Sequence, residues 1–587
     1  MDPAAPSTSG EFTLQGIPVS RGIGIAPIHV VARGFNAPEV YKVSNIEAEK
    51  QRFRVALERT KVQLRELQQR IEAISGEKDS QIFEAHLMML EDRAIVDKVD
   101  EAIAKRGQNA EFALYAVAQN FLEAMRRVPD PYLRERTADI EDVCQRVLRN
   151  FSPEEQRDSA PQEQHLLVAY DLSPSDTAAM NRQLLLGFAT ELGSVNSHTA
   201  ILARSLGIPA VVGLEGAVLA VTALTPAIID GYSGKLILYP TEETLRHYTQ
   251  LKEQKEQVRH ELEAQRDAAA VTLDGRAITL SANIELVEEL PLVQNSGAHG
   301  VGLYRTEFLL LKGEELPGET QQTETYSRLA EALAPHPLII RTLDSGGDKL
   351  PVEPLTEPEP NPFLGWRGIR VSLDRPDMFK EQLRAILRAS VHGHVAVMFP
   401  LVSGIKEVRR GKDMIKECMD ELARQDIPFD ENLEIGIMIE VPSAAVIADL
   451  IAPEVDFFSI GTNDLIQYTV AVDRVNHHVA DLYRPTHPAV IRLIKQTIDA
   501  GTANNIWTGV CGEMAGDILL TPLLLGLGVQ ELSVGPHQVP SVRRAIRALN
   551  HAECQEMAAQ AVRTPLSLDI LDLTSALASK YYPDLLD

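Results

Sequence analysis

The sequence predicts a multidomain α/β protein whose C-terminal half is a TIM (β/α)8 barrel. Eight apolar runs of strand length follow one another after about residue 272, and the intervals between them are long enough for helices. Eight strands in roughly 300 residues is typical of a TIM barrel. A length of 587 residues exceeds one ordinary domain, and a second group of strand patterns near the N-terminus predicts a separate α/β domain.

The N-terminal half is predicted to hold that α/β domain and an inserted helical bundle. Residues 1–12 are a polar tail, which we expect to be flexible. Strand patterns in 13–33 and again in 155–240 predict one α/β domain that is interrupted in the sequence. Over 34–154, apolar residues recur at spacings of three, four and seven, which is typical of amphipathic helices in a bundle. Residues 241–270 are charged and contain no glycine or proline, so we expect a long helical linker.

Residues 271–577 are assigned to the barrel, with its expected strands at 277–284, 300–305, 338–344, 395–400, 434–440, 456–464, 506–513 and 531–535. Polar side chains stand at the carboxyl ends of these strands, where TIM barrels carry their active sites. Ordinary capping of strands by polar residues would explain any one of them, but the whole set predicts a site at this face. The set is Arg305, Arg341, Asp344, Glu440, Asn463, Asp464 and Cys511.

Four arginines are candidates for binding an anionic substrate. Arg305 and Arg341 end two expected strands, and Arg367 and Arg474 lie in later loops. The guanidinium group is always charged and binds carboxylate or phosphate oxygens through paired hydrogen bonds. A single arginine is more often a surface residue, so the prediction rests on the group. Together they predict a small substrate that carries both a phosphate and a carboxylate.

Two carboxylates and one thiol are candidates for the chemistry. Glu440 and Asp464 end the fifth and sixth expected strands, and Mg²⁺ binds one or two protein carboxylates while substrate and water complete its shell. A Mg²⁺ site is therefore predicted, with a general-acid pair and two salt-bridged carboxylates as alternatives. Cys511 lies at the end of the seventh expected strand, and the glycines on both sides, Gly509 and Gly512, leave its sulfur approachable. Its thiol could donate a proton to an enolate carbon, the alternative being a buried structural cysteine.

One histidine in the N-terminal half is a candidate phosphoryl acceptor. His198 lies in Gly193–Arg204 (GSVNSHTAILAR), between turn and cap residues and an apolar run that predicts a helix. Free backbone N–H groups at a helix start favour anions, so a phosphoryl group could be loaded onto the imidazole there. The alternative is a histidine that is satisfied by hydrogen bonds at the start of a helix.

Composition excludes several classes of partner. A net charge of −26 argues against nucleic acid and against anionic membrane surfaces. The four cysteines are scattered, without the spacing of a metal site, and fit reduced thiols better than a disulfide framework. The N-terminus lacks the features of a signal peptide, and no apolar run approaches the length of a membrane span. We therefore expect a cytoplasmic protein without membrane insertion.

The barrel and the helical insert carry several long motifs. They are Gly300–Phe308 (GVGLYRTEF), Asn361–Arg367 (NPFLGWR), Asp456–Leu465 (DFFSIGTNDL), Ile82–Asp92 (IFEAHLMMLED) and Tyr132–Arg136 (YLRER). With these motifs the chain resembles Enzyme I of the phosphoenolpyruvate:sugar phosphotransferase system (PTS), over about residues 15–575.

The resemblance implies a reaction. Phosphoenolpyruvate (PEP) would bind in the barrel with Mg²⁺ and phosphorylate His198, whose α/β domain then swivels to pass the phosphoryl group to the carrier protein HPr, docked on the helical insert. Cys511 would protonate the enolate to give pyruvate, and the barrel would form a homodimer. The remaining implied roles are PEP binding by Arg305, Arg341, Asn463, Asp464 and Arg474, Mg²⁺ binding by Glu440 and Asp464, orientation of the histidine by Ser173, and support by Arg367.

The chain departs from the family at the histidine loop, where Val195 replaces an arginine that many members carry. Three alternatives remain at this point. A relative of pyruvate phosphate dikinase or PEP synthase would need an ATP-grasp domain, for which the chain has no room or nucleotide-binding pattern. A regulatory paralogue of the nitrogen type is expected to carry an N-terminal sensory domain, for which this sequence shows no pattern, but the variant loop before His198 leaves this alternative open. A non-catalytic interaction protein would not need His198, the arginines and Cys511 together.

Overall fold

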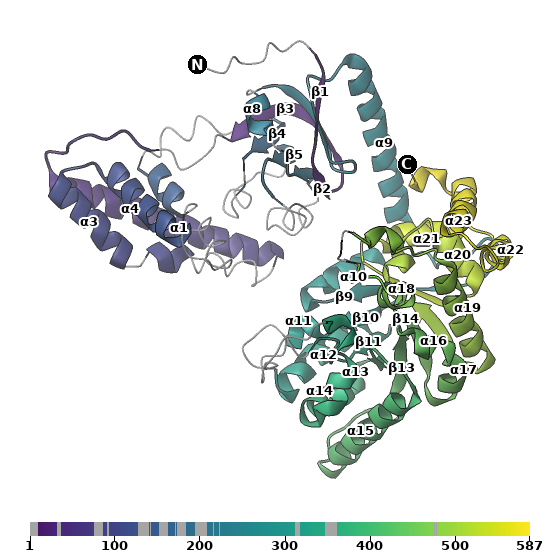
Figure 1. Ribbon diagram of the computed structural model, residues 1–587. Helices are drawn as coiled ribbons and strands as arrows, with labels where there is room; N and C mark the ends of the chain where they lie inside the picture. The colour runs from purple at the N-terminus through teal and green to yellow at the C-terminus, as the bar shows by residue number, and fades with distance from the viewer. Residues whose placement is uncertain are drawn as a thin grey trace. The chain divides into compact units, whose positions relative to one another are not determined.

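The computed structural model describes two compact units, Met1–Glu256 and Gln257–Asp587, each of which is treated by itself (Figure 1). The residues described are 10–31, 37–75, 86–90, 93–126, 140, 143–151, 163–170, 172, 184–193, 203, 208–214, 216–221, 224–310, 317–346, 361–474, 476 and 478–586. Within them, no helix combines the length and the apolar character that crossing a membrane requires.

The first unit contains an eight-stranded mixed sheet with the order β1-β8-β7-β3-β4-β5-β6-β2. Strands from both sides of the helical segment share this sheet, because β3 pairs in parallel with β4. The strong Val, Ile and Leu content of these short runs suits buried strands. The strands are β1 (Phe12–Gln15), β2 (Ile17–Ser20), β3 (Ile23–Val31), β4 (His165–Ala169), β5 (Leu185–Thr190), β6 (Ala210–Val212), β7 (Pro226–Asp230) and β8 (Lys235–Leu238).

Most of the described residues between β3 and β4 are helical. The described helices there include α1 (Ile46–Ser75), α3 (Arg93–Arg106) and α4 (Ala110–Arg126). Their apolar faces share one core, in which Phe53 and Val99 are fully buried. After a short α8 (Ala217–Ala220) and the end of the sheet, the long α9 (Glu242–Ala264) follows.

The second unit is a closed barrel of eight parallel strands, which confirms the predicted fold class. β16 closes the barrel by pairing with β9, with Glu531 opposite Thr279. Helices surround the strands (Figure 1), as the alternation of apolar runs and helix-length intervals predicts. The strands are β9 (Thr279–Ile284), β10 (Val301–Arg305), β11 (Leu338–Arg341), β12 (Val395–Phe399), β13 (Glu434–Ile439), β14 (Phe457–Ile460), β15 (Trp507–Val510) and β16 (Glu531–Val534).

The α-helices of this unit vary from one turn to five or more. The longest of them, α15, packs against its neighbours with an apolar stripe that includes Met414 and Leu422. They are α10 (Leu290–Ser296), α11 (Glu307–Leu310), α12 (Glu319–Leu333), α13 (Ile369–Asp374), α14 (Pro376–Ala389), α15 (Ile405–Arg424), α16 (Pro442–Val446), α17 (Ala448–Ile451), α18 (Thr462–Val470), α19 (Pro488–Ala503), α20 (Thr521–Leu527), α21 (Val539–Ala548), α22 (His551–Ala561) and α23 (Ser567–Tyr581).

Several expected strands end earlier than predicted: the run 338–344 ends as a strand at Arg341, and the run 506–513 ends at Val510. The run 456–464 was expected to be strand throughout, but β14 ends at Ile460 and α18 begins at Thr462. Asn463 and Asp464 therefore lie in the first turn of a helix and not at the end of a strand. Glycine followed by Thr, Asn and Asp favours a helix start, because such side chains compete with regular backbone pairing.

A carboxyl group is buried inside the barrel. Glu531 is only 5% exposed, and Ser281 Oγ donates a hydrogen bond of 2.5 Å to its Oε1. Two glycines make room for it, since a Cβ atom at Gly302 or Gly509 would lie within 3.0 Å of a Glu531 oxygen. Burial raises the pKa of Glu531 to about 7, so folding favours its protonated form.

This pKa gives a testable dependence of stability on pH. The Glu531 carboxyl has an ordinary pKa of 4.5 and a folded pKa of about 7, so its contribution to the free energy of unfolding falls as pH rises between these values. Glu531→Gln should therefore become more stable relative to wild type by ~1–3 kcal/mol between pH 5 and pH 8. Urea unfolding followed by tryptophan fluorescence reports on this unit alone, because Trp366 and Trp507 are the only tryptophans. The exposed Glu556→Gln is the matched control, and a difference that stays constant with pH would contradict the prediction.

Candidate active site

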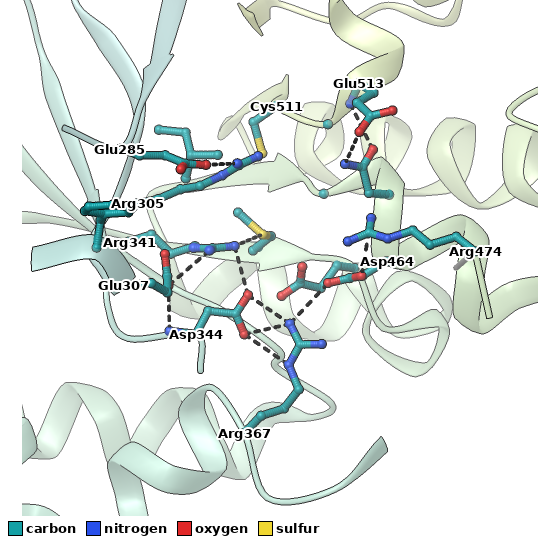
Figure 2. Close-up of a pocket in the computed structure, with 17 residues that line it drawn as sticks. Glu285, Arg305, Glu307, Arg341, Asp344, Arg367, Asp464, Arg474, Cys511 and Glu513 are labelled. Carbon is teal, nitrogen blue, oxygen red and sulfur yellow. Dashed lines mark hydrogen bonds and ion pairs between the residues drawn. The ribbon is translucent and has the colours of Figure 1, made fainter. Parts of the chain in front are cut away.

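A cavity of about 360 Å³ opens at the carboxyl ends of the barrel strands (Figure 2). Its volume suits a small molecule. Eight of the ten residues predicted for the site line it together. They are Arg305, Arg341, Arg367, Glu440, Asn463, Asp464, Arg474 and Cys511.

Two of the arginines come directly from strand ends. Arg305 closes β10 and forms an ion pair with Glu285, which follows β9. Arg341 closes β11 and is paired twice, through Nη2 with Glu307 Oε1 at 3.1 Å and through Nη1 with Asp344 Oδ2 at 2.9 Å. Burial disfavours the charge on Arg341, but Glu307, Asp344 and Glu440 outweigh burial and raise its pKa. Arg341 therefore stays positively charged although it is almost completely buried.

The third arginine joins two carboxylates. Arg367 donates to both oxygens of Asp344 through Nη2, each at 3.0 Å, and its Nη2 lies 3.3 Å from Asp464 Oδ2. Its Nη1 donates to the hydroxyl of Tyr468 at 3.2 Å. The fourth arginine, Arg474, is more loosely placed, with Nη1 4.0 Å from Asp464 Oδ1. An anion that enters the cavity would thus find cationic groups on several sides (Figure 2).

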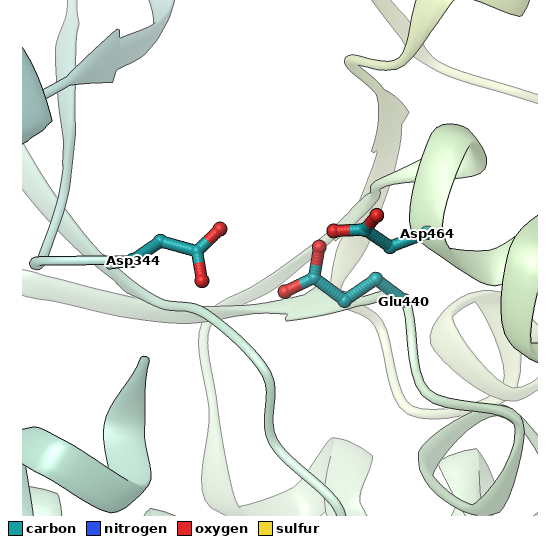
Figure 3. A group of neighbouring side chains, drawn as sticks. All are labelled: Asp344, Glu440 and Asp464. Carbon is teal, nitrogen blue, oxygen red and sulfur yellow. The ribbon is translucent and has the colours of Figure 1, made fainter. Parts of the chain in front are cut away.

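Three carboxylates lie close together beside these arginines. Asp344, Glu440 and Asp464 each offer an oxygen, and these oxygens lie within 4.8 Å of one another (Figure 3). Glu440 Oε1 accepts a hydrogen bond of 2.6 Å from the backbone N–H of Leu401. Burial, with the charges of Asp344 and Asp464, raises the pKa of Glu440. A divalent cation would relieve this repulsion, and carboxylate oxygens are the ligands that hard cations prefer.

One further observation supports a fit to a metal ion. Asp464 Oδ1 is buried and accepts no hydrogen bond among the described residues. A buried carboxylate oxygen without a hydrogen bond is costly unless a cation is near. The donor set of the cluster is therefore suitable for a divalent metal.

The thiol and the amide of the site belong to adjacent segments. Asn463 and Glu513 bind each other twice, since Asn463 Nδ2 donates to Glu513 Oε1 at 3.3 Å and the backbone N–H of Glu513 donates to Asn463 Oδ1 at 3.0 Å. Cys511 is 2% exposed, and its Sγ lies 3.7 Å from the carbonyl oxygen of Ile460. Burial raises the pKa of Cys511 to about 11, so the sulfur carries its proton at neutral pH.

Sequence reasoning named most of the cavity but missed its acidic partners. Asp344 was recognised at a strand end, yet its place in the carboxylate cluster was not predicted. Glu285, Glu307 and Glu513 were missed altogether, although Glu307 stands two residues after Arg305 and Glu513 two residues after Cys511. That spacing after a predicted site residue could have indicated Glu307 and Glu513, whereas Glu285 has no such signal. His198 and Ser173 lie outside the described residues, so their roles remain predictions.

Comparisons with known proteins agree over most of the chain. Residues 15–136, 161–234 and 259–551 match the families described as "PEP-utilising enzyme, N-terminal", "PEP-utilising enzyme, mobile domain" and "PEP-utilising enzyme, PEP-binding domain". A relative from Staphylococcus carnosus named phosphoenolpyruvate-protein phosphotransferase is 42% identical over 562 residues, which cover 95% of this chain and 98% of its own. A relative of the same name from Listeria innocua is 41% identical over 95% of this chain and 98% of its own.

A solved structure is similar to part of the chain. It is an NMR solution structure of an Enzyme I (nEIt) protein, 36% identical to this sequence, and it covers 41% of this chain and 99% of its own with a TM-score of 0.35.

The protonation state of Cys511 can be tested directly. With a pKa of about 11, the thiolate fraction at pH 8 is only about one in a thousand. The rate at which iodoacetamide modifies Cys511, followed by mass spectrometry of its peptide, should therefore rise about tenfold per pH unit from pH 7 to pH 10. Labelling of the urea-unfolded protein is the control, in which the same thiol has its ordinary pKa. A rate that reaches a plateau below pH 9 in the folded protein would show that the pKa of the Cys511 thiol is not raised, and would contradict the prediction.

Proposed function

Since the chain belongs to the family of phosphoenolpyruvate-protein phosphotransferases, we propose that it transfers the phosphoryl group of PEP through His198 to a histidine of the carrier protein HPr and releases pyruvate. This would be the first step of sugar uptake by the PTS. The observation that carries the proposal is the barrel cavity, which combines four arginines, a carboxylate cluster and a protonated thiol.

The arginines suit the two anionic groups of PEP. Arg305, Arg341 and Arg474, with the amide of Asn463, would bind the phosphate and the carboxylate through charge-assisted hydrogen bonds. Arg367 would support them by holding Asp344 and Asp464 in place. Each arginine is already paired with a carboxylate. These pairs orient the arginines before PEP binds, and the anionic groups of PEP would then replace the carboxylates as partners.

The carboxylate cluster suits Mg²⁺. Glu440 and Asp464 would hold the ion, and Asp344 adds negative charge at the same place. When bound, Mg²⁺ would neutralise charge on the phosphate and on the developing enolate. Asp464 Oδ1, which accepts no hydrogen bond among the described residues, supports this assignment.

The proposed reaction has two steps, transfer of the phosphoryl group to His198 and protonation of the enolate by Cys511. The bond between phosphorus and the enol oxygen of PEP breaks as a ring nitrogen of neutral His198 forms a new bond to phosphorus. The electron pair of the broken bond leaves as the enolate of pyruvate. Cys511 Sγ then gives its proton to the methylene carbon of the enolate, which yields pyruvate, and the thiolate regains a proton from water.

The proposal assigns a task to each part of the chain. The α/β domain of residues 13–33 and 155–240 would carry His198, oriented by Ser173, and would swivel between the barrel and HPr. Residues 34–154 would dock HPr, with 1–12 as a tail and 241–270 as the linker. The barrel, residues 271–577, would bind PEP and form a homodimer. The buried free cysteines are consistent with a cytoplasmic location.

The alternative functions are less well supported. Both relatives that cover almost the whole chain carry the name of a PEP-protein phosphotransferase. Neither name indicates an ATP-dependent dikinase, a synthase or a regulatory paralogue.

Phosphorylation of His198 tests the proposal as a whole. Incubation with ³²P-labelled PEP and Mg²⁺ should give label that is lost in acid and kept in base, as expected for phosphohistidine. His198→Ala should take up no label, whereas His247→Ala, which removes an exposed histidine of α9, should be labelled like wild type. Acid-labile label on the His198→Ala protein would refute the assignment.

The metal ligands can be tested without turnover. Glu440→Gln and Asp464→Asn keep the shape of each side chain but remove a charged ligand oxygen. Binding of Mn²⁺, measured by electron paramagnetic resonance as a substitute for Mg²⁺, should weaken about tenfold or more in each variant. Glu285→Gln changes a carboxylate that lines the cavity outside the cluster, so it should bind Mn²⁺ like wild type. Unchanged affinity in both ligand variants would place the metal elsewhere.

A further inference from the structure

We propose that Asn283 is a positioning residue that holds the backbone of Cys511 and so aims its thiol at the substrate; the inference rests on the proposed function of the cavity. Asn283 lies on β9 and is not among the residues that line the cavity. Its side chain nevertheless reaches the segment that carries the proton donor, 228 residues further along the chain.

The amide of Asn283 is fully used in hydrogen bonds. Its Nδ2 donates to the carbonyl oxygen of Cys511 and to the carbonyl oxygen of Ser533, each at 3.0 Å. Its Oδ1 accepts a hydrogen bond of 2.6 Å from Ser533 Oγ. A primary amide can donate twice and accept at the same time, and an aspartate or an apolar side chain of this size could not make these contacts.

The barrel topology explains why a side chain is needed here. β9 and β15 are not neighbours, because β16 lies between them, so the Asn283 amide spans β16 to reach Cys511. The register between β15 and β16 ends at Val510 opposite Leu532, one residue before Cys511. The carbonyl of Cys511 thus lies beyond the paired part of the strand, and Asn283 supplies its donor.

The contacts around Cys511 restrain its other groups. Its backbone N–H donates to the carbonyl oxygen of Ile460 at 3.1 Å. Gly512 lies so close to the start of α18 that a Cβ atom there would be 2.0 Å from Thr462 Oγ1. The N–H of Cys511 is thus bound from the β14 side, and Gly512 is held by close packing. The hydrogen bond from Asn283 then fixes the orientation of the peptide group between Cys511 and Gly512.

The consequence for the reaction is specific. Arg305 and Arg341 lie on β10 and β11 and take no part in the hydrogen bonds of the Asn283 amide, so PEP should still bind when the amide is removed. A proton donor that is displaced by about 1 Å can lose about 100-fold in rate. Asn283 should therefore affect the rate of protonation and the face of the enolate that receives the proton, and leave the PEP concentration dependence almost unchanged.

The test measures single-turnover formation of pyruvate by the full chain with Mg²⁺, because this step needs no carrier protein. Asn283→Ala should lower the rate at saturating PEP about 10- to 100-fold and change the half-saturating PEP concentration by less than about twofold. PEP labelled stereospecifically with deuterium at C3, converted in tritiated water, should give a methyl group of one configuration with wild type. Asn283→Ala should give a partly scrambled methyl group, which a general loss of stability would not produce.

A second variant isolates the route through Cys511. In a Cys511→Ala background, Asn283→Ala should slow pyruvate formation by no more than about twofold further, because the group it positions is gone. An equal slowing with and without Cys511, or an unchanged rate with a single methyl configuration in Asn283→Ala, would overturn the inference. Ser281→Ala is the matched control, since Ser281 is also on β9 but bonds Glu531, and it should leave rate and configuration unchanged.

Two outcomes separate this inference from the proposed function. If Cys511→Ala forms pyruvate at the rate of wild type and with one methyl configuration, the proposed proton donor is wrong. If Cys511→Ala is slow and Asn283→Ala is not, only the role of Asn283 fails. Should Asn283→Ala not fold, Ser533→Ala removes the hydroxyl that orients the amide and should show the same changes to a smaller extent; unchanged rate and configuration there would count against the inference.

Discussion

A chain of buried ion pairs holds the charged groups of the cavity: Glu307 pairs with Arg341, Arg341 with Asp344, Asp344 with Arg367, and Arg367 with Asp464. Charges at this depth are tolerated only when each has an opposite partner and good hydrogen bonds. Asp344 is central because it serves two arginines at once. An anion and a cation that enter together can replace these pairs, which suits a ligand that combines phosphate, carboxylate and a divalent metal.

The closed barrel makes this chain of ion pairs possible, because all the parallel strands of the barrel end at one face. Arg341 ends β11, Glu440 follows β13, and Cys511 follows β15. Arg367 and Asp464 are 97 residues apart in the sequence and still within bonding distance. Each group is held by a different strand or helix start, and the ion pairs link neighbouring groups, so a substitution of Asp344 is expected to affect both Arg341 and Arg367.

The same geometry explains how far the sequence alone could lead. The eight strands were predictable because buried parallel strands are continuous apolar runs, and polar residues at their ends had to converge. Whether Asp344 pairs with arginines or joins a carboxylate cluster depends on the register between neighbouring strands. In the structure Asp344 does both. The amide of Asn283 reaches across β16 to Cys511, a contact that no local pattern signals. The position of Asp464 in a helix was not predicted, because a short apolar run followed by polar residues is compatible with either a strand or a helix.

Burial acts differently on the groups that share the cavity. It raises the pKa of the Cys511 thiol and of the Glu440 carboxyl, whereas neighbouring carboxylates keep Arg341 charged in spite of burial. The thiol therefore retains its proton, with the carbonyl oxygen of Ile460 3.7 Å from Sγ as an acceptor, and the Glu440 carboxylate would be stabilised by a nearby cation. A raised pKa keeps the proton on sulfur but does not aim it. The direction of the Sγ–H bond depends on the backbone of Cys511, which the carbonyl of Ile460 and the amide of Asn283 hold from opposite sides.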